Sequence, residues 1–411
     1  MQEKATIRLW RNGDFLKLWI GATVSLFGDQ ITDLAVPVLA LVLLHVSAGQ
    51  LGLLTAAEAA PILVVGLLAG VWVDRFHRRF IMVSADIGRA FLLVLVPIAA
   101  WLGILTFWLL VVVGFGAGVL SVFFSVANQS FLPTLLPQED ELLEGNARIA
   151  LSESVAQVGG PTLAGLLLQI VAAPLAILLD SVSFLWSAAW LASIKVPEPV
   201  PSGTKRTQFW QDLFTGIRFV FTNPLLRALG ACTATGSLFA VWITTVLLVY
   251  ILRELHASAF ILGIVFAAGN IGALAGAPLA RPITRKFGRR KTLFFGPLLA
   301  SCGALFLFGA HGPVLVAVFC IVLFQLLGRF GITVYSINQA TLRQQETPRE
   351  LRGRMNAAMR MFYLGVMPIG ALLGGYLAQA FGLWPALVLG ACGFLLPVVW
   401  LWFSPVRHLN R

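Results

Sequence analysis

Charged side chains are scarce in this sequence. Only 11% of its 411 residues are Asp, Glu, Lys or Arg, whereas 58% are hydrophobic, and the mean hydropathy is +0.88. An average soluble domain has about 25% charged residues. The composition excludes the soluble globular class and indicates that a lipid bilayer surrounds the chain.

Cysteine is also rare, and the motifs of common catalytic sites are missing. The four cysteines lie in apolar stretches without CxxC spacing, which excludes a disulfide framework and gives no support to a metal site. No GxxxxGK[ST], HExxH or GxSxG motif occurs, and the glycines at 114, 116 and 118 lie in an apolar run rather than in a dinucleotide loop. We therefore expect no catalytic residues, no cofactor and no enzymatic activity.

Long hydrophobic runs dominate what remains. A membrane-spanning helix needs about 20 mostly apolar residues, so the chain can hold about twelve of them. We predict an all-α integral membrane protein with twelve transmembrane helices. The expected spans are 15–44, 50–73, 80–100, 105–131, 147–170, 175–194, 219–250, 259–280, 292–310, 313–339, 355–380 and 384–403.

The basic residues follow membrane topology. The net charge of +11 and the pI of about 10.2 would suggest a nucleic-acid partner in a soluble protein. Here Lys and Arg gather in alternate connections, around 75–79, 195–206, 281–291 and 343–354, whereas the opposite connections hold only Arg253. By the positive-inside rule we expect both termini in the cytoplasm of a prokaryotic cell, a multi-pass protein in the inner membrane, and no nucleic-acid partner.

The two halves of the sequence repeat each other. At a shift of 211 residues Asn12 matches Asn223 and His45 matches His256, and at 210 residues Gly160 matches Gly370. Two parallel six-helix halves are the architecture of the major facilitator superfamily (MFS). We expect an N-terminal bundle at 1–194, a cytoplasmic linker at 195–217 and a C-terminal bundle at 218–411.

The segment GVWVDRFHRR lies between the second and third predicted spans. It resembles the superfamily signature G-x-x-x-D-R-x-G-R-R/K, with His77 where glycine is usual. Glycine would allow close helix approach, the aspartate could cap a neighbouring helix N-terminus, and the arginines would form a charge network at an inner gate. The alternative is a merely positive inner loop. The gating residues expected here are Gly70, Asp74, Arg75, Arg78 and Arg79.

Two further motifs lie inside spans. Asp86 and Arg89 are three residues apart, hence on one helical face, and a charge at that depth is costly unless paired. We interpret them as a structural or gating pair, with direct substrate contact as the alternative. Gly160, Pro161 and Gly165 resemble the end of an exporter signature, G-P-x-x-G-G, and predict a bend in the fifth span, although simple helix packing would also favour small residues there.

The carboxylates inside predicted spans all belong to the first half of the chain. A proton carrier of carboxylate type must therefore lie in that half. We predict Asp29 and Asp33, four residues apart, and Glu58 at similar depth as the proton-coupling residues. The alternative is that each merely hydrogen-bonds within the bundle. The full set of carboxylates within the spans is Asp29, Asp33, Glu58, Asp86, Glu153 and Asp180.

The second half carries cations and aromatic residues instead. Of its intramembrane arginines, Arg227 and Arg360 lie near span ends and can reach the interface. Arg329 is predicted to line the substrate cavity, where it could attract an anionic group. Phe239 and Trp242 are predicted to offer aromatic surface to a ligand, with helix packing or lipid contact as the alternative.

Segments along the whole chain resemble the drug:proton antiporter-3 branch of the superfamily, which includes macrolide-efflux and enterobactin-export proteins. They are FGD, LTAAEAAP, GVWVDRFHRR, ADIGRA, LLPQEDELLEGNA, LDSVSFLWSA, TPRELRGRMNAAMR and PIGALLGG.

This resemblance implies proton-driven export of a small, often amphipathic molecule of the drug, macrolide or siderophore class. The expected partners are this substrate, protons and the lipid bilayer, and we expect a monomer. The alternatives are a proton-independent facilitator or importer on the same fold, and a membrane sensor or assembly factor that does not transport.

Overall fold

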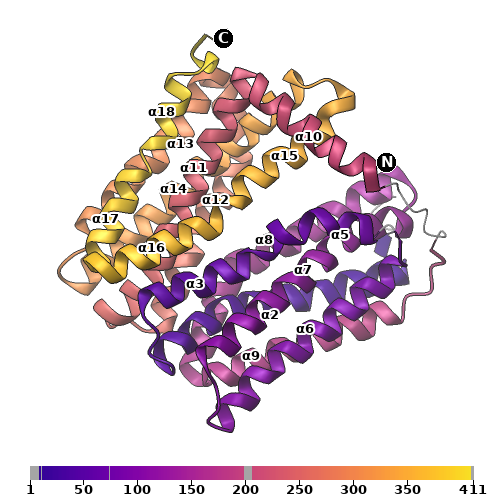
Figure 1. Cartoon of the computed structure of the whole chain (residues 1–411), viewed down its shortest axis with the longest axis horizontal. Coiled ribbons are helices and arrows are strands. Elements are labelled where there is room, and N and C mark those ends of the chain that lie inside the picture. The colour runs from indigo at the N-terminus through magenta and orange to yellow at the C-terminus, as the bar shows by residue number, and fades with distance from the viewer. Residues whose placement is uncertain (1–8, 11, 74, 199–205, 409–411) are drawn as a thin grey trace. The chain divides into compact units, whose positions relative to one another are not determined.

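A computed structural model describes residues 9–10, 12–73, 75–198 and 206–408, and all its regular elements are helical (Figure 1). The helices of the first half are α2 Gly13–Val42, α3 Ala48–Ala59, α4 Pro61–Val64, α5 Gly66–Val73, α6 Arg78–Trp101, α7 Phe107–Leu135, α8 Glu139–Ile170 and α9 Ala173–Ala192.

The second half begins with α10 Arg206–Thr222, so the predicted linker at 195–217 is helical from Arg206 onward. The α-helices that follow are α11 Pro224–Val249, α12 Ala259–Phe287, α13 Arg289–Leu305, α14 Val314–Glu346, α15 Arg352–Gly365, α16 Met367–Phe381, α17 Leu383–Gly393 and α18 Leu396–Trp402. Short π or 3-10 helical turns are Tyr250–Glu254, Phe306–Gly309, Arg349–Leu351 and Pro405–His408.

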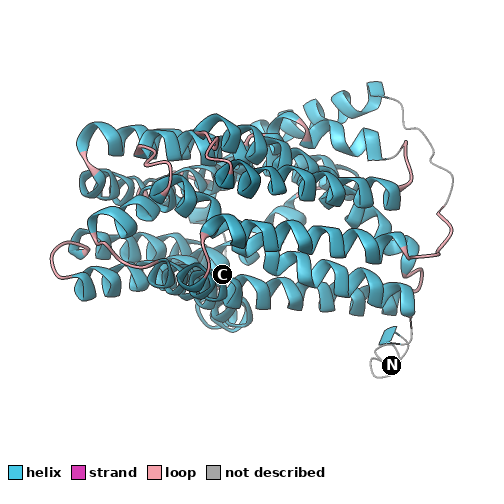
Figure 2. Cartoon of the chain, turned by 90° about the horizontal axis from the view of Figure 1, so that it is seen from below, coloured by secondary structure: helices cyan, strands magenta, loops and turns pink. Residues whose placement is uncertain are grey.

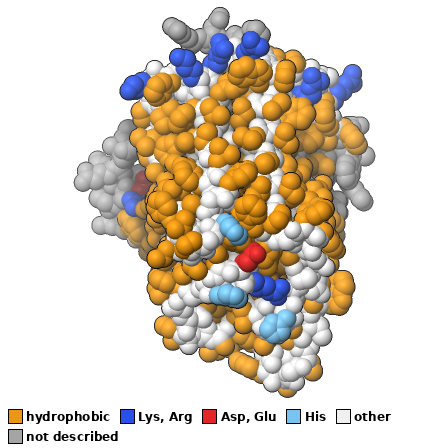
Figure 3. Space-filling model, turned by 90° about the vertical axis from the view of Figure 1, so that its left-hand side faces the viewer, with side chains coloured by type: hydrophobic (Ala, Val, Ile, Leu, Met, Phe, Trp, Pro, Cys, Tyr) orange, Lys and Arg blue, Asp and Glu red, His pale blue; other side chains and the backbone are white. Residues whose placement is uncertain are grey.

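The predicted fold class is confirmed. Ten of the described helices, some joined to a neighbouring helical segment, are long and apolar enough to cross a membrane. The charge-rich α8 and the interrupted run α3 to α5 account for the remaining two of twelve crossings. Large side chains such as Phe91, Val112 and Leu315 are exposed by 64%, 63% and 85%, as expected for surfaces that face lipid. On the face drawn in Figure 3, hydrophobic side chains cover most of the surface and Lys and Arg gather at one end.

Proline interrupts three predicted spans. The second span breaks at Ala60 because Pro61 starts the new helix α4, and the seventh starts five residues later than predicted because Asn223 and Pro224 separate α10 from α11. The eleventh span breaks at Val366, before Pro368 in the first turn of α16. Proline lacks the N–H that would continue a helix and is favoured in its first turn.

The internal repeat is visible in local geometry. Asn12 accepts hydrogen bonds from the backbone N–H groups two and three residues on, at the start of α2, and Asn223 does the same at the start of α11. His45 and His256 are the two non-glycine residues with positive φ among the described residues, at 50° and 48°. Both matched pairs lie 211 residues apart, so the repeat in sequence is a repeat in structure.

Contacts within the chain define two compact units. The first contains Met1–His45 and Ala57–Thr204, and the second contains Val46–Ala56 and Lys205–Arg411. Figure 2 shows the helices and the loops that connect them. The core of the first unit includes Phe15, Leu18, Met82, Phe131 and Leu191, all almost fully buried.

Glycine allows close packing inside the second unit. A Cβ on Gly272 or Gly276 of α12 would collide with backbone oxygens of α14, and Gly52 of α3 lies against Gly375 of α16 in the same way. Beside this contact Ser47 Oγ donates to Gln379 Oε1 at 3.0 Å. Small residues let helix backbones approach where lipid, not water, surrounds the protein.

The repeated asparagine caps lead to a stability prediction. Asn223→Ala is expected to destabilise the protein by about 1 kcal/mol, because two N–H groups at the start of α11 lose their acceptor. Thermal unfolding in detergent measures the effect as a lower Tm. Asn223→Asp is the control, since aspartate caps equally well and should leave Tm close to that of the parent protein. An equal loss in both variants would contradict the capping role.

Candidate functional site

A buried polar cluster lies where α2, α6 and α9 pack together in the first unit. Asp180 of α9 is 1% exposed and accepts hydrogen bonds from the hydroxyl of Thr32 on α2 and from Ser183 Oγ, the latter at 2.9 Å. Gly28 makes room for this carboxylate, because any Cβ there would overlap the side chains of Asp180 and Ser183. A glycine therefore allows α2 to approach the carboxylate of α9.

Asp86 and Arg89 form a buried ion pair on α6, as their spacing predicted. They are 0% and 4% exposed. The guanidinium carbon of Arg89 lies 4.6 Å from the ring centre of Phe124 and 4.0 Å from that of Phe184. Aromatic faces and one carboxylate together stabilise a cation at this depth.

The three predicted proton-coupling residues come together in the first unit. Asp33 is exposed, whereas Asp29 and Glu58 are half-buried, and the charges of Asp29 and Glu58 both act on Asp33. Glu58 is accommodated by α7, because a Cβ on Gly114 would come within 2.9 Å of Glu58 Cγ. The glycines of α7 thus leave room for Glu58 where α7 packs against α3. They lie in a helix and form no nucleotide-binding loop.

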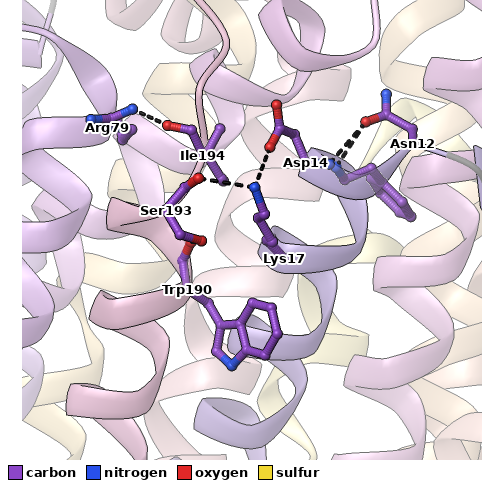
Figure 4. A network of polar contacts seen from close by, with 8 residues as sticks. Asn12, Asp14, Lys17, Arg79, Trp190, Ser193 and Ile194 are labelled. Atoms are coloured by element: carbon purple, nitrogen blue, oxygen red, sulfur yellow. Dashed lines mark hydrogen bonds and ion pairs between the residues drawn. The ribbon is translucent and has the colours of Figure 1, made fainter.

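Basic residues bind carbonyl groups at the C-terminal end of α9 (Figure 4). Lys17 Nζ donates to Asp14 Oδ1 at 2.8 Å and to the carbonyl oxygen of Ser193 at 2.9 Å, and Arg79 donates to the carbonyl oxygen of Ile194. Cations at the last carbonyls of a helix satisfy free acceptors and complement the helix dipole. Arg79 of the predicted gate is therefore tied to the end of α9.

The carboxylate that caps α6 is Glu198, which the sequence analysis did not select. Its two oxygens accept from the backbone N–H groups of Arg78 at 2.6 Å and Arg79 at 2.9 Å. Asp74, for which a capping role was expected, lies outside the described residues. The sequence marks Glu198 as one of two carboxylates in a basic linker, and its partner 120 residues away could not be read from the sequence.

The remaining small residues of the motifs differ in their packing. The close-approach role expected of Gly70 is wrong, because a Cβ there would meet no atom within 4 Å. Gly160 does pack tightly, against the side chain of Gln30 on α2. Pro161 and Gly165 are buried in α8, which continues as one helix through the proline. Arg75 is exposed.

The predicted ligand residues of the second unit lie in different surroundings. Arg329 is exposed near the middle of the 33-residue α14, with its aliphatic stem against Gly269. Phe239 is half-buried, with its ring centre 5.6 Å from that of Trp242. Trp242 is 6% exposed and donates from Nε1 to the carbonyl oxygen of Ala386 at 3.0 Å. This indole joins α11 to α17 and offers little surface to a ligand.

Within the described residues, no three His, Cys, Asp or Glu side chains are grouped so as to hold a metal ion. The polar cluster contains more carboxylates than cations. Carboxylates that lack a cation are the groups through which such a cluster can bind and release protons. One cation, Arg89, stands beside several carboxylates.

Comparison with known proteins adds the family. The transmembrane secretion effector family matches residues 5–411. The multidrug efflux pump Tap of Mycolicibacterium fortuitum is 25% identical over 407 residues, covering 94% of this chain and 96% of Tap. The enterobactin exporter EntS of Shigella dysenteriae is 26% identical over 389 residues, covering 94% of this chain and 89% of EntS.

A solved structure supports the fold. The bacterial homologue of the human lysosomal transporter Spinster superposes with a TM-score of 0.72 at 15% identity, over 94% of both chains. At that identity the likeness concerns the architecture alone.

The cap formed by Glu198 leads to a second prediction. Glu198→Ala is expected to destabilise the protein by about 1.5 to 3 kcal/mol, because two N–H groups at the start of α6 lose a charged acceptor. Glu198→Gln keeps one oxygen acceptor and should lose less. Thermal unfolding of the three proteins in the same detergent measures the order, and equal Tm values for all three would contradict the cap.

Proposed function

Because the chain belongs to the transmembrane secretion effector family of the major facilitator superfamily, we propose that it is a proton-coupled exporter of a small amphipathic molecule. The family assignment makes the chain a multi-pass bacterial membrane transporter rather than an enzyme. Proton coupling, the direction of transport and the substrate class are the proposed part.

Support for proton coupling comes from three neighbouring carboxylates, those of Asp29, Asp33 and Glu58. Each is at least partly accessible in a membrane helix, and their charges lie close enough to act on Asp33. The ion pairs described in the first unit engage other carboxylates, namely Asp14, Asp86 and Glu144. Arg89 also acts on Asp29, but it is already paired with Asp86, so negative charge exceeds positive charge around this group and favours the uptake of a proton.

Proton binding would act on the conformational equilibrium. A proton shifts an equilibrium only through its different affinity for the two states, and removal of negative charge changes the repulsion within this group. In an alternating-access cycle, a difference in water access to Asp33 between states would supply that difference in affinity. The basic gate at Arg75, Arg78 and Arg79 would then separate from its partners in one state. Both termini would be cytoplasmic and the transporter a monomer.

The proposed substrate is a small amphipathic molecule of the drug, macrolide or siderophore class. Tap and EntS are named for multidrug efflux and enterobactin export, which supports this range. Arg329 would contact an anionic part of the substrate, since an exposed arginine at the centre of a membrane helix is costly against lipid and favourable beside water or an anion. Phe239 would offer an apolar face, and Trp242 would hold the wall behind it.

The carboxylates give the central functional prediction. In reconstituted vesicles, export of a fluorescent cationic dye should follow an imposed pH gradient. Asp29→Asn, Asp33→Asn or Glu58→Gln should abolish the gradient dependence in at least one case, because the amide cannot carry the proton. Glu144→Gln is the control, since it changes a carboxylate paired with Arg148 far from this group in sequence.

Either of two results would contradict the proposal. Dye movement that ignores the gradient in the unmodified protein would indicate a facilitator. Undiminished gradient response in all three variants would remove these residues from the coupling step.

A separate prediction concerns Arg329. Arg329→Gln should raise the KM for an anionic amphipathic dye by about tenfold, the value expected for the loss of one charge-assisted contact. Arg329→Lys keeps the charge and should cost less. The KM for the cationic dye should change little in either variant. An equal change for both dyes would contradict an anion-binding role.

A further inference from the structure

We infer that Asp180 of α9 is a further proton-binding residue, which exchanges a proton with Asp29 of α2, and that Thr32 is the positioning residue for it. This inference rests on the proposed function and extends the proton site from the accessible carboxylates into the packed interior of the first unit.

The first argument is the set of partners around Asp180. Its side chain is 1% exposed, and both described hydrogen bonds to it come from neutral hydroxyl groups, those of Thr32 and Ser183. An ionised carboxylate in an apolar interior needs a cation or several strong donors to offset the loss of water. Two hydroxyls are a weak substitute, and a bound proton removes the charge altogether.

The second argument is the charge that faces Asp180 from each neighbouring helix. α2 contributes Asp29 and, one turn on, Asp33, whereas α6 contributes Asp86 and Arg89. α8 carries Glu153, whose side chain is exposed. Arg89 is the only cation in this set, and Asp86 already binds it. The carboxylates of this group outnumber the cation, so they cannot all be ionised at low cost.

The third argument concerns unpaired hydrogen-bonding atoms in the same interior. Asp86 Oδ2, Arg89 Nε and Ser187 Oγ are buried atoms without a hydrogen-bond partner. Ser187 is 0% exposed, and its hydroxyl group lies close enough to act on Asp86. Buried polar atoms are nearly always paired. The polar interior around Arg89 is therefore not fully hydrogen-bonded, and these atoms can form new hydrogen bonds when the protonation of a neighbouring carboxylate changes.

The proposed step moves one proton and changes no other bond. The carboxyl O–H of Asp29 breaks, leaving a carboxylate near Arg89, and the proton binds Asp180 Oδ2, the oxygen that accepts from Thr32, directly or through a water molecule. Asp180 then changes from an acceptor at both oxygens to a donor at one of them. The hydroxyl of Thr32 must reorient in response, which links proton occupancy to the contact of α2 with α9 at Gly28.

The experiment compares four variants in the vesicle assay with a pH gradient. Asp180→Asn should lower gradient-driven export of the cationic dye by about tenfold or more, while dye binding and gradient-independent exchange persist. Asp180→Glu should restore part of the gradient response. Thr32→Val should keep export but shift the pH at which it is half-maximal. Ser181→Ala, on the same helix but bonded to the carbonyl of Ala90, is the matched control and should behave like the unmodified protein.

Infrared difference spectra between high and low pH report the protonation of carboxyl groups directly. A variant that only disturbs helix packing would not remove a carboxyl band from them. The unmodified protein should show the C=O stretching band of a protonated carboxyl group, and part of that band should be missing in Asp180→Asn. If that variant fails to fold, a shifted band in Thr32→Val tests the same assignment.

The outcomes separate this inference from the proposed function. Full gradient response and an unchanged infrared band in Asp180→Asn, together with loss of coupling in Asp29→Asn, would overturn the role of Asp180 and leave the exporter intact. No gradient response in the unmodified protein would overturn both.

Discussion

The cost of placing charge in a hydrocarbon environment governs this structure. With so few charged residues in the chain, each one inside a membrane helix requires a partner, access to water or a bound proton. Arg89 has the first, through Asp86 and two aromatic rings. Asp33 is exposed, and the proposed coupling role gives it the second in one state of the cycle. Among the described residues, the hydrogen bonds to Asp180 come from two neutral hydroxyl groups. A bound proton is therefore the third way to lower the cost of its charge.

The two units differ in the charged residues that their membrane helices contain. The first unit collects the intramembrane carboxylates and balances them with one arginine and several hydroxyl groups. The spans of the second unit contain no carboxylate in their described part, apart from Glu254, Glu346 and Glu350 at their ends, and their helices pack through glycine. The proposed proton chemistry would therefore lie in the first unit, whereas Arg329 of the second unit lies in the middle of a helix whose described carboxylate, Glu346, is at its end.

Much of this arrangement could be predicted from the sequence because it depends on local or periodic signals. Hydrophobic run length gave the helices, and the match of Asn12 with Asn223 predicted a repeat that reappears as two identical helix caps. The pairing of Asp86 with Arg89 followed from a spacing of three. By contrast, the break at Val366 depends on where a proline falls relative to tertiary packing, and Gly70 was assigned a close contact that its neighbours do not make. The cap from Glu198 joins residues 120 apart, which no local pattern encodes.

Helix α9 connects the polar interior of the first unit with the basic residues at its C-terminal end. Its middle is joined to α2 through Asp180 and Thr32, and its end is held by Lys17 and Arg79. The distance along the helix from Asp180 to Ser193 is about 20 Å at 1.5 Å per residue. Since a packed helix moves as a rigid element, a change in its contact with α2 at Asp180 must be accommodated at the carbonyls that Lys17 and Arg79 bind. Helix α9 would then couple the protonation of the interior to the conformation of the basic gate. The gate would need no proton-binding group of its own.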